Sequence, residues 1–232
     1  MSDLAGRVAL VTGVTGGLGP HVARALLDAG ASVVGTARKV TETDIPYPGF
    51  TAMPAEISSR AAAQSLIDQI LTRFGRLDIV AHVIGGFAGG ATVAEADDAV
   101  YEQMFNVNFY TLLHVLQAAI PPLRRSQHGR IVAIGSRAAL EPGATVGAYS
   151  ASKAAAVSLI RTVAIENKDA GLRTNIILPG TIDTAANRRD MPNADFSKWV
   201  RPDNIASLVT WLASDAGQDV NGAVLPVYGA DG

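Results

Sequence analysis

The sequence predicts an α/β fold, a doubly wound parallel sheet of about seven strands with helices on both faces. Short apolar runs typical of buried strands alternate with longer runs of helical periodicity, and such alternation favours parallel strands joined by helices. The chain has 232 residues, of which 48% are hydrophobic and 17% charged, so it can bury a large core. We find no internal repeat, low-complexity tract or linker and expect one domain over residues 1–232.

The expected elements follow one another in alternating order. Strands are expected at residues 7–12, 31–37, 50–54, 77–83, 130–135, 173–178 and 223–227. Helices are expected from Pro20 to Leu27 and at residues 59–74, 97–123, 149–169 and 203–214. Ser58 is the expected N-cap of the helix at 59–74. Residues 40–49 and 183–202 contain prolines, and we expect both segments to be irregular.

Composition excludes several classes of function. The chain has no cysteine, so disulfides, thiolate chemistry and cysteine-based metal sites are excluded, and no metal site is expected. The net charge is −2 without a basic tract, which gives nucleic-acid binding no electrostatic support. No apolar run of 18 or more residues predicts a membrane span, and the N-terminus lacks the pattern of a signal peptide. We therefore expect a cytoplasmic protein.

A glycine-rich turn, residues 13–19, lies between the first strand and the first helix. Glycines allow the backbone to approach a ligand closely, and free N–H groups at the helix N-terminus bind phosphate, so this arrangement suits a dinucleotide pyrophosphate. Arg38 follows the second strand, where an acid would bind the ribose of NAD and a base suits the 2′-phosphate of NADP. A solvated surface charge is the alternative for Arg38.

Tyr149 and Lys153 begin an apolar helical run and lie four residues apart, which places them on one helix face. A nearby ammonium lowers the pKa of a phenol, and a phenol with a lowered pKa can act as a general acid or base. Ser136 directly follows the strand at 130–135, where open α/β sheets place their sites. The segment between Ser136 and Tyr149 could bring the two hydroxyls together, although the spacing of Tyr149 and Lys153 also occurs by chance.

Two further features lie near predicted strand ends or inside a helix. Glycines at 85, 86, 89 and 90 follow the strand at 77–83, which indicates backbone lying against a ligand or a plain flexible loop. Asn106 and Asn108 fall inside the helix expected at 97–123, where asparagine is unfavourable. One of them is a candidate functional residue, and an ordinary surface asparagine is the alternative.

Taken together, these motifs resemble the short-chain dehydrogenase/reductase family over essentially the whole chain. The resemblance implies a Rossmann-type fold, hydride transfer between a nicotinamide and a carbonyl or alcohol, and the catalytic residues Asn108, Ser136, Tyr149 and Lys153. Tyr149 would exchange the proton, Ser136 would bind the substrate oxygen, Lys153 would lower the phenol pKa and bind the ribose, and Asn108 would hold a relay water. The expected cofactor contacts are Gly13, Thr15, Gly16, Gly17, Leu18, Gly19, Arg38, Glu56, Ile57, Gly85, Gly86, Tyr149, Lys153, Pro179, Gly180 and Ile182. NADP is the preferred cofactor, and NAD is possible.

The chain departs from the family pattern at three places. His82-Val83-Ile84-Gly85 replaces the usual Asn-Asn-Ala-Gly, Gly16 stands where many NADP-dependent members carry a basic residue, and Glu56 replaces an aspartate. Residues 85–90 and parts of 183–199 instead resemble quinonoid dihydropteridine reductase, which makes a pteridine-type reductase an alternative. That enzyme carries an acid after its second strand and lacks the family serine.

The substrate is expected to be a small carbonyl or alcohol that contacts Ser136 and Tyr149, with Phe87, Leu140 and Trp199 as apolar contacts. Ordinary loop packing is the alternative for these three. A non-catalytic NADP-binding sensor is a further alternative, although the chain retains all four relay residues. The resemblance also implies a homo-oligomer, a tetramer or dimer formed through the helices at 97–123 and 149–169.

Overall fold

The computed structural model describes residues 3–231, and these residues form a seven-stranded sheet in which all neighbouring strands are parallel. The strand order is β3-β2-β1-β4-β5-β6-β7. The strands are β1 (Val8–Thr12), β2 (Ser32–Thr36), β3 (Phe50–Ala52), β4 (Ile79–His82), β5 (Arg130–Ile134), β6 (Arg173–Pro179) and β7 (Val224–Val227). The chain order reverses between β1 and β4, as in other doubly wound folds.

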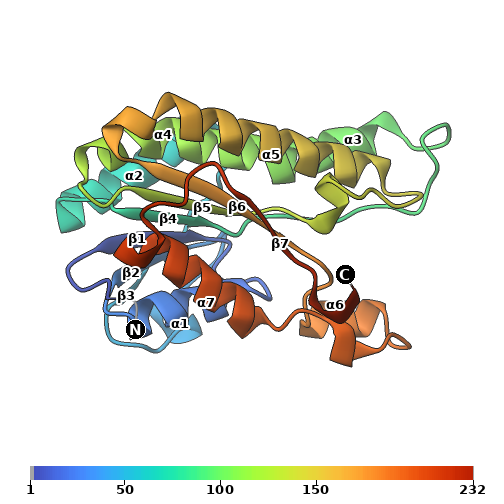
Figure 1. Cartoon of the computed structure of the whole chain (residues 1–232), viewed down its shortest axis with the longest axis horizontal. Helices are drawn as coiled ribbons and strands as arrows, with labels where there is room; N and C mark the ends of the chain where they lie inside the picture. The colour runs from blue at the N-terminus through green and yellow to red at the C-terminus, as the bar shows by residue number, and fades with distance from the viewer. Residues whose placement is uncertain (1–2, 232) are drawn as a thin grey trace.

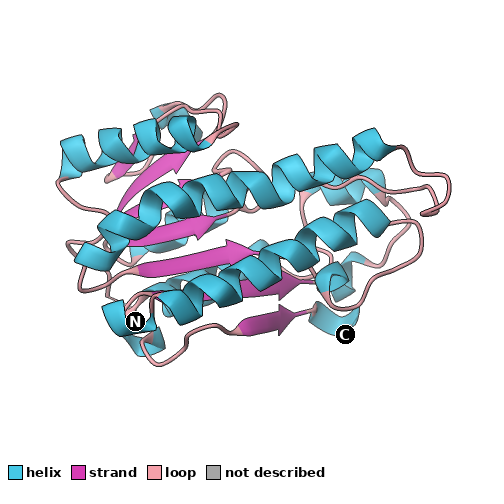
Figure 2. Ribbon diagram, turned by 90° about the horizontal axis from the view of Figure 1, so that it is seen from above, coloured by secondary structure: helices cyan, strands magenta, loops and turns pink. Residues whose placement is uncertain are grey.

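Helices cover both faces of the sheet (Figure 1). One face carries α2 (Arg60–Phe74), α4 (Thr111–Arg125) and α5 (Gly147–Glu166), and the other carries α1 (Gly19–Asp28) and α7 (Pro202–Ala213). Figure 2 shows the strands running in one direction beneath the long helices. Each face has its own buried apolar cluster, and because both faces are covered the central strands are mostly apolar. The predicted fold class is confirmed.

The early elements lie close to their expected positions. Pro20 occupies the first turn of α1, where its missing N–H is not needed. Residues 40–49 contain only a 3-10 turn, Glu42–Asp44, as the prolines indicated. The predicted N-cap of α2 was wrong by one residue: Ser59, not Ser58, accepts the Ala62 N–H at 3.2 Å.

The helix predicted at 97–123 is present over residues 98–125, but it is not uniform and consists of three consecutive pieces. These are α3 (Asp98–Phe105), a π-helical turn at Asn106–Tyr110, and α4. The Thr111 hydroxyl donates to the Val107 carbonyl at 2.7 Å, so side-chain bonds within and next to the turn compensate for its irregular backbone. π-turns are rare and concentrate at functional sites, which draws attention to the asparagines inside this one.

The prediction that residues 183–202 are irregular was also wrong in part. They contain α6 (Ala185–Asp190) and a 3-10 turn at Phe196–Lys198. Thr184 caps α6 by accepting the Asn187 N–H at 3.2 Å, and Asn187 in turn donates to the Ile182 carbonyl at 2.8 Å. Figure 1 places α6 beyond the carboxyl end of β7. Within residues 3–231, no helix has both the length and the apolar content that a membrane span requires.

Candidate active site

The candidate site lies at the carboxyl ends of β1, β4 and β5. These three strands are neighbours, with Thr12 opposite His82 and His82 opposite Ala133 in the register. The loops that follow them carry the glycine-rich turn 13–19, the glycines at 85–90, and Ser136. The switch between β1 and β4 is the position at which open α/β sheets bind ligands.

The glycine-rich turn is shaped for close backbone approach. Gly13 has φ +67°, and a Cβ there would lie 3.0 Å from the Ile84 backbone nitrogen. A Cβ at Gly19 would overlap the Gly13 carbonyl oxygen, so the turn can tighten only without side chains at these positions. Thr15, Gly16 and Gly17 are exposed and lead into α1, whose first N–H groups have no helical partner. This cradle fits a dinucleotide pyrophosphate.

The side chain of Leu18 does not face this cradle, because it is buried in the core beneath α1. Thr184, which the sequence analysis did not single out as a cofactor contact, does reach the turn. A Cβ on Gly17 would lie 2.7 Å from the Thr184 methyl carbon, so the start of α6 packs against the glycine-rich turn. The N-capping pattern of Thr184 ahead of α6 is the sequence signal that would have found it.

The other predicted cofactor contacts surround the same strand ends. Arg38 is exposed just beyond β2 and forms no ion pair with another described residue. Glu56 is exposed and Ile57 is buried in the loop after β3. Pro179 ends β6, and the Gly180 N–H donates to the Val227 carbonyl at 2.9 Å. Ile182 pairs with Val200 in an isolated parallel bridge.

The four predicted catalytic residues converge at this edge. Tyr149 and Lys153 come from the first turns of α5, and the Ser136 side chain at the end of β5 hydrogen-bonds with the Tyr149 phenol. Asn108, the fourth residue, lies near Lys153 across Gly85: a Cβ at Gly85 would lie 3.0 Å from Lys153 Nζ and 3.2 Å from Asn108 Oδ1. One spot on the Gly85 backbone is therefore adjacent to both side chains.

Asn108 is buried inside the π-turn and bonds in several directions. Its Oδ1 accepts the Gly86 N–H at 2.9 Å, and its Nδ2 donates to the Gly86 carbonyl at 3.1 Å and to Ser152 Oγ at 3.0 Å. Ser152 Oγ donates to the Tyr149 carbonyl at 2.8 Å. Asn108 therefore links the glycine loop after β4 to the helix that carries Tyr149 and Lys153. Asn106 does not take part in these bonds.

Burial controls the protonation of the site. It lowers the pKa of Lys153 to about 8, and the Lys153 ammonium donates to the Ile134 carbonyl at 3.2 Å. Burial raises the pKa of the Tyr149 phenol, and the hydrogen bond with Ser136 lowers it. The prediction that this pKa lies below its ordinary value was wrong, because burial outweighs the other effects. Lys153 Nζ lies 6.0 Å from the centroid of the Tyr149 ring.

His82 is a buried member of this region whose contacts the sequence did not predict. Its Nδ1 lies 3.1 Å from Thr12 Oγ1, and its Nε2 lies 3.5 Å from Thr111 Oγ1. Burial, together with the charge of Lys153, lowers the pKa of His82 to about 3. The imidazole is therefore neutral at physiological pH. A histidine that ends an otherwise apolar strand, where the family has asparagine, is the signal in the sequence.

Of the three predicted apolar substrate contacts, only Phe87 meets the phenol. It is 68% exposed, and its ring packs edge-on against the Tyr149 ring with centroids 5.0 Å apart. Leu140 instead lines a groove on the outer face of α5, together with Val157 and Ile165. Trp199 is buried and packs against Phe196, with ring centroids 4.7 Å apart.

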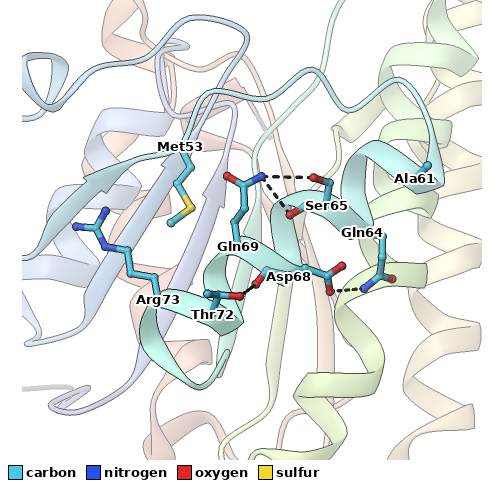
Figure 3. Close-up of a pocket in the computed structure, with 8 residues that line it drawn as sticks. All are labelled: Met53, Ala61, Gln64, Ser65, Asp68, Gln69, Thr72 and Arg73. Carbon is cyan, nitrogen blue, oxygen red and sulfur yellow. Dashed lines mark hydrogen bonds between the residues drawn. The ribbon is translucent and has the colours of Figure 1, made fainter.

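A separate groove of about 640 Å³ lies on the outer face of α2 and is lined by residues from Met53 to Arg73 (Figure 3). Its polar groups bond to one another along the helix: Gln64 donates to Asp68 at 2.9 Å, and Thr72 donates to the Asp68 carbonyl at 2.8 Å. No polar groups converge on a ligand position there, unlike at the carboxyl edge. Among residues 3–231 no cluster of three histidine, cysteine or acidic side chains could hold a metal ion.

Comparisons with known proteins agree with this geometry. The family model for short chain dehydrogenase matches residues 7–195. The rhamnolipids biosynthesis 3-oxoacyl-[acyl-carrier-protein] reductase of Pseudomonas aeruginosa is 33% identical, over 98% of this chain and 96% of that protein.

Solved structures of similar proteins cover the whole fold. The Pseudomonas aeruginosa RhlG/NADP active-site complex has a TM-score of 0.89 at 31% identity and covers 98% of this chain and 96% of that one. A blue fluorescent protein from a metagenomic library, in complex with NADPH, has a TM-score of 0.85 at 28% identity, with 98% of each chain covered. With the family model, the curated relative and the strand-end site in agreement, this chain belongs to the short-chain dehydrogenase family.

Proposed function

We propose that the protein is an NADP(H)-dependent oxidoreductase that interconverts a carbonyl and an alcohol, with Tyr149 as the general acid and base. The observation that carries this proposal is the convergence of Asn108, Ser136, Tyr149 and Lys153 on the strand end beside the glycine-rich turn. Family membership supports oxidoreductase chemistry in general, and the arrangement of these side chains supports this particular proton chemistry.

The roles of the side chains follow from their positions. A bound nicotinamide supplies or accepts the hydride. In the reducing direction, Tyr149 donates its phenolic proton to the carbonyl oxygen as negative charge develops there, and Ser136 donates a hydrogen bond to the same oxygen. The Lys153 cation stabilises the phenolate that remains, because an opposite charge nearby favours the ionised form. The phenolate then regains a proton by way of the Lys153 ammonium, and Lys153 is resupplied by a water that Asn108 would hold.

NADP is the proposed cofactor because Arg38 is an exposed cation without an ion-pair partner among the described residues, just beyond β2. Two similar solved structures are complexes with NADP and NADPH, which supports the same assignment. We expect NADPH to bind more tightly than NADH in a fluorescence titration, and Arg38→Ala to weaken NADPH binding about tenfold, as for the loss of one charge-assisted contact. Tighter NADH binding that Arg38→Ala leaves unchanged would contradict the preference.

The reaction class is tested by following the oxidation of NADPH with a panel of ketones, 3-oxoacyl thioesters and a quinonoid dihydropterin. We expect turnover with at least one of the carbonyl compounds. Turnover with the pterin alone would favour the pteridine-type reductase. Tight NADPH binding without turnover of any compound would instead favour the sensor.

We also propose a homo-oligomer formed through α4 and α5. A groove of about 330 Å³ on the outer face of α5 is lined partly by apolar side chains, among them Leu140 and Ile165, which are 55% and 71% exposed. Exposed apolar side chains next to a long helix are typical of subunit interfaces. Small-angle scattering that gives a monomer mass would contradict this proposal. The cytoplasmic location expected from the sequence stays a prediction.

A further inference from the structure

We propose that His82 is a positioning residue: as a neutral imidazole protonated on Nε2, it bridges Thr12 and Thr111 and so holds the segment Val83–Gly86 and the π-turn Asn106–Tyr110 in register. These segments carry the glycines next to the cofactor cradle and the relay residue Asn108. The proposal rests on the proposed function only for its effect on turnover.

The tautomer follows from the hydrogen bonds of Thr111. Its hydroxyl donates to the Val107 carbonyl at 2.7 Å, so its proton is already used. Toward His82 Nε2, 3.5 Å away, the Thr111 oxygen can therefore only accept, which requires the proton on Nε2. Nδ1 is then an acceptor, and it takes the proton of the Thr12 hydroxyl at 3.1 Å.

The Thr12 end of the bridge continues into the glycine loop. With its proton directed to His82, Thr12 Oγ1 accepts the Val83 N–H at 3.2 Å. At the other end of the same loop, the Asn108 carboxamide holds both the N–H and the carbonyl of Gly86. The segment Val83–Gly86 is thus fixed at both ends.

His82 connects these two attachments. Thr111 directly follows the π-turn, and the Val107 carbonyl to which it bonds belongs to that turn. Hydrogen bonds therefore run from Thr12 through His82 and Thr111 to Val107. The next residue, Asn108, accepts the Gly86 N–H, which closes the path. Apolar packing of His82 would not require donors and acceptors to match around this closed path. Burial and, to a smaller extent, the cation of Lys153 lower the pKa of His82, so the bridge stays in its neutral form.

The first test removes both hydrogen bonds of His82 in one variant and one of them in another, and it follows amide hydrogen exchange of the full-length protein. His82→Leu removes both bonds, and we expect faster exchange in residues 83–86 and 106–110 with little change elsewhere. His82→Asn keeps an acceptor near the position of Nδ1 and loses the donor to Thr111. We therefore expect it to retain protection at 83–86 and to lose it at 106–110.

The second test measures turnover at a temperature at which thermal unfolding shows each variant to be folded. Because a displacement of about 1 Å in a catalytic group can reduce rates about a hundredfold, we expect His82→Leu to lower kcat at least tenfold, with a smaller change in the Kd of NADPH. Thr111→Val should lower kcat similarly, and the double variant should lose no more than either single one, since both remove the same bridge. Thr210→Val is the matched control: this buried threonine of α7 donates to the Ala206 carbonyl at 2.9 Å, far from the site, and its kcat should stay unchanged.

Two outcomes would overturn the inference. One is a folded His82→Leu protein with kcat within about twofold of wild type and unchanged exchange at 83–86 and 106–110. The other is exchange that rises evenly over the whole molecule without loss of kcat, which indicates a general packing role. If the wild type reduces no carbonyl compound, the proposed function fails, and the exchange pattern of the two His82 variants alone decides the bridge.

Discussion

The two ends of the parallel strands differ in how buried charged groups are paired. At the amino edge, where the strands begin, buried charges have partners of opposite charge. Arg76 donates two hydrogen bonds to the fully buried Asp78 carboxylate at 2.7 and 2.8 Å, and Arg7 pairs with Asp215 at 2.7 Å. The buried Arg130 lies 3.8 Å from the same Asp215. Hydrogen bonds and charge from these arginines hold the pKa values of both acids below their ordinary range.

At the carboxyl edge, the buried titratable groups lack a partner of opposite charge among the described residues. Lys153 bonds only to the Ile134 carbonyl, Tyr149 to Ser136, and His82 to two threonines. The pKa values of Lys153 and His82 therefore fall to about 8 and about 3, and that of Tyr149 rises. Each of these shifts disfavours the charged form.

This difference in pairing indicates that the amino edge serves stability and the carboxyl edge serves function. Removing one member of a buried pair at the amino edge leaves the other without its partner and opposes folding, whereas burying a lysine without a counter-ion itself opposes folding and is retained where it serves chemistry. We therefore expect substitutions at the amino edge to lower stability with little effect on turnover. Substitutions at the carboxyl edge should lower turnover with little loss, or even a gain, of stability.

The largest expected effect is that of Tyr149→Phe on turnover. Loss of the general acid should lower kcat about a thousandfold, since such groups contribute about 10² to 10⁴ in rate. The Kd of NADPH should change by no more than about threefold, and the urea unfolding midpoint should stay close to that of wild type. Near-normal turnover by this variant would remove Tyr149 from the proton-transfer role.

At the opposite edge, Asp78→Ala should lower the free energy of unfolding by about 3 kcal/mol, because it leaves the Val8 N–H, the Ser126 hydroxyl and one arginine without their acceptor. Urea unfolding measures this loss, and kcat of the folded variant should equal that of wild type. Since the folded-state pKa of Asp78 is lowered, its contribution is complete above its unfolded-state pKa near 3.9 and declines as the pH falls further. The exposed Asp68→Ala is the control and should change stability by less than about 0.5 kcal/mol.

Local sequence patterns were enough to predict the fold and the position of the candidate site. The sheet, its order of elements and the placement of Ser136, Tyr149 and Lys153 could be predicted because they depend on local periodicity and on the rule that parallel strands end at one edge. The catalytic roles of these residues stay predictions until turnover is measured.

Features set by tertiary contacts could not be predicted from local pattern. The π-turn depends on Asn108 bonding to Gly86, which is 22 residues away in the chain. The raised pKa of Tyr149 depends on its burial in the folded protein, and helical spacing alone gave the opposite sign. Leu140 and Trp199 are apolar residues whose direction no periodic pattern fixes: Leu140 lines the groove on the outer face of α5, and Trp199 packs against Phe196.

A sharper test of the comparison is Lys153→Met, which should lower turnover less than Tyr149→Phe does, yet raise the free energy of unfolding by about 2 kcal/mol at pH 7. The lowered pKa of about 8 means that the folded protein binds this proton less tightly than the unfolded chain, and the lost bond to the Ile134 carbonyl offsets part of the gain. Because the unfolded chain binds more protons above pH 8, wild-type stability from this group rises between about pH 8 and 10.5.

The advantage of the Lys153→Met variant should accordingly shrink across that range, as measured by urea unfolding at several pH values. Lys168→Met is the control, since that lysine is exposed, and it should show no such trend. A Lys153→Met protein that is less stable than wild type at pH 7 would contradict the view that this edge carries an unfavourable buried charge.

The smallest expected effect concerns backbone strain, which is also found at the carboxyl edge. Among the described residues, Thr145 is the only non-glycine with positive φ, at 62°, and its carbonyl accepts the Gly90 N–H at 2.8 Å beside the glycine loop. A β-branched residue is strained in this region, so Thr145→Gly should raise the free energy of unfolding by about 1 kcal/mol after the entropy of glycine is counted. Thr145→Ala keeps the Cβ and should recover less. If both variants are less stable than wild type in urea, the threonine side chain contributes contacts that outweigh the strain, and the carboxyl edge stores less of it than the comparison implies.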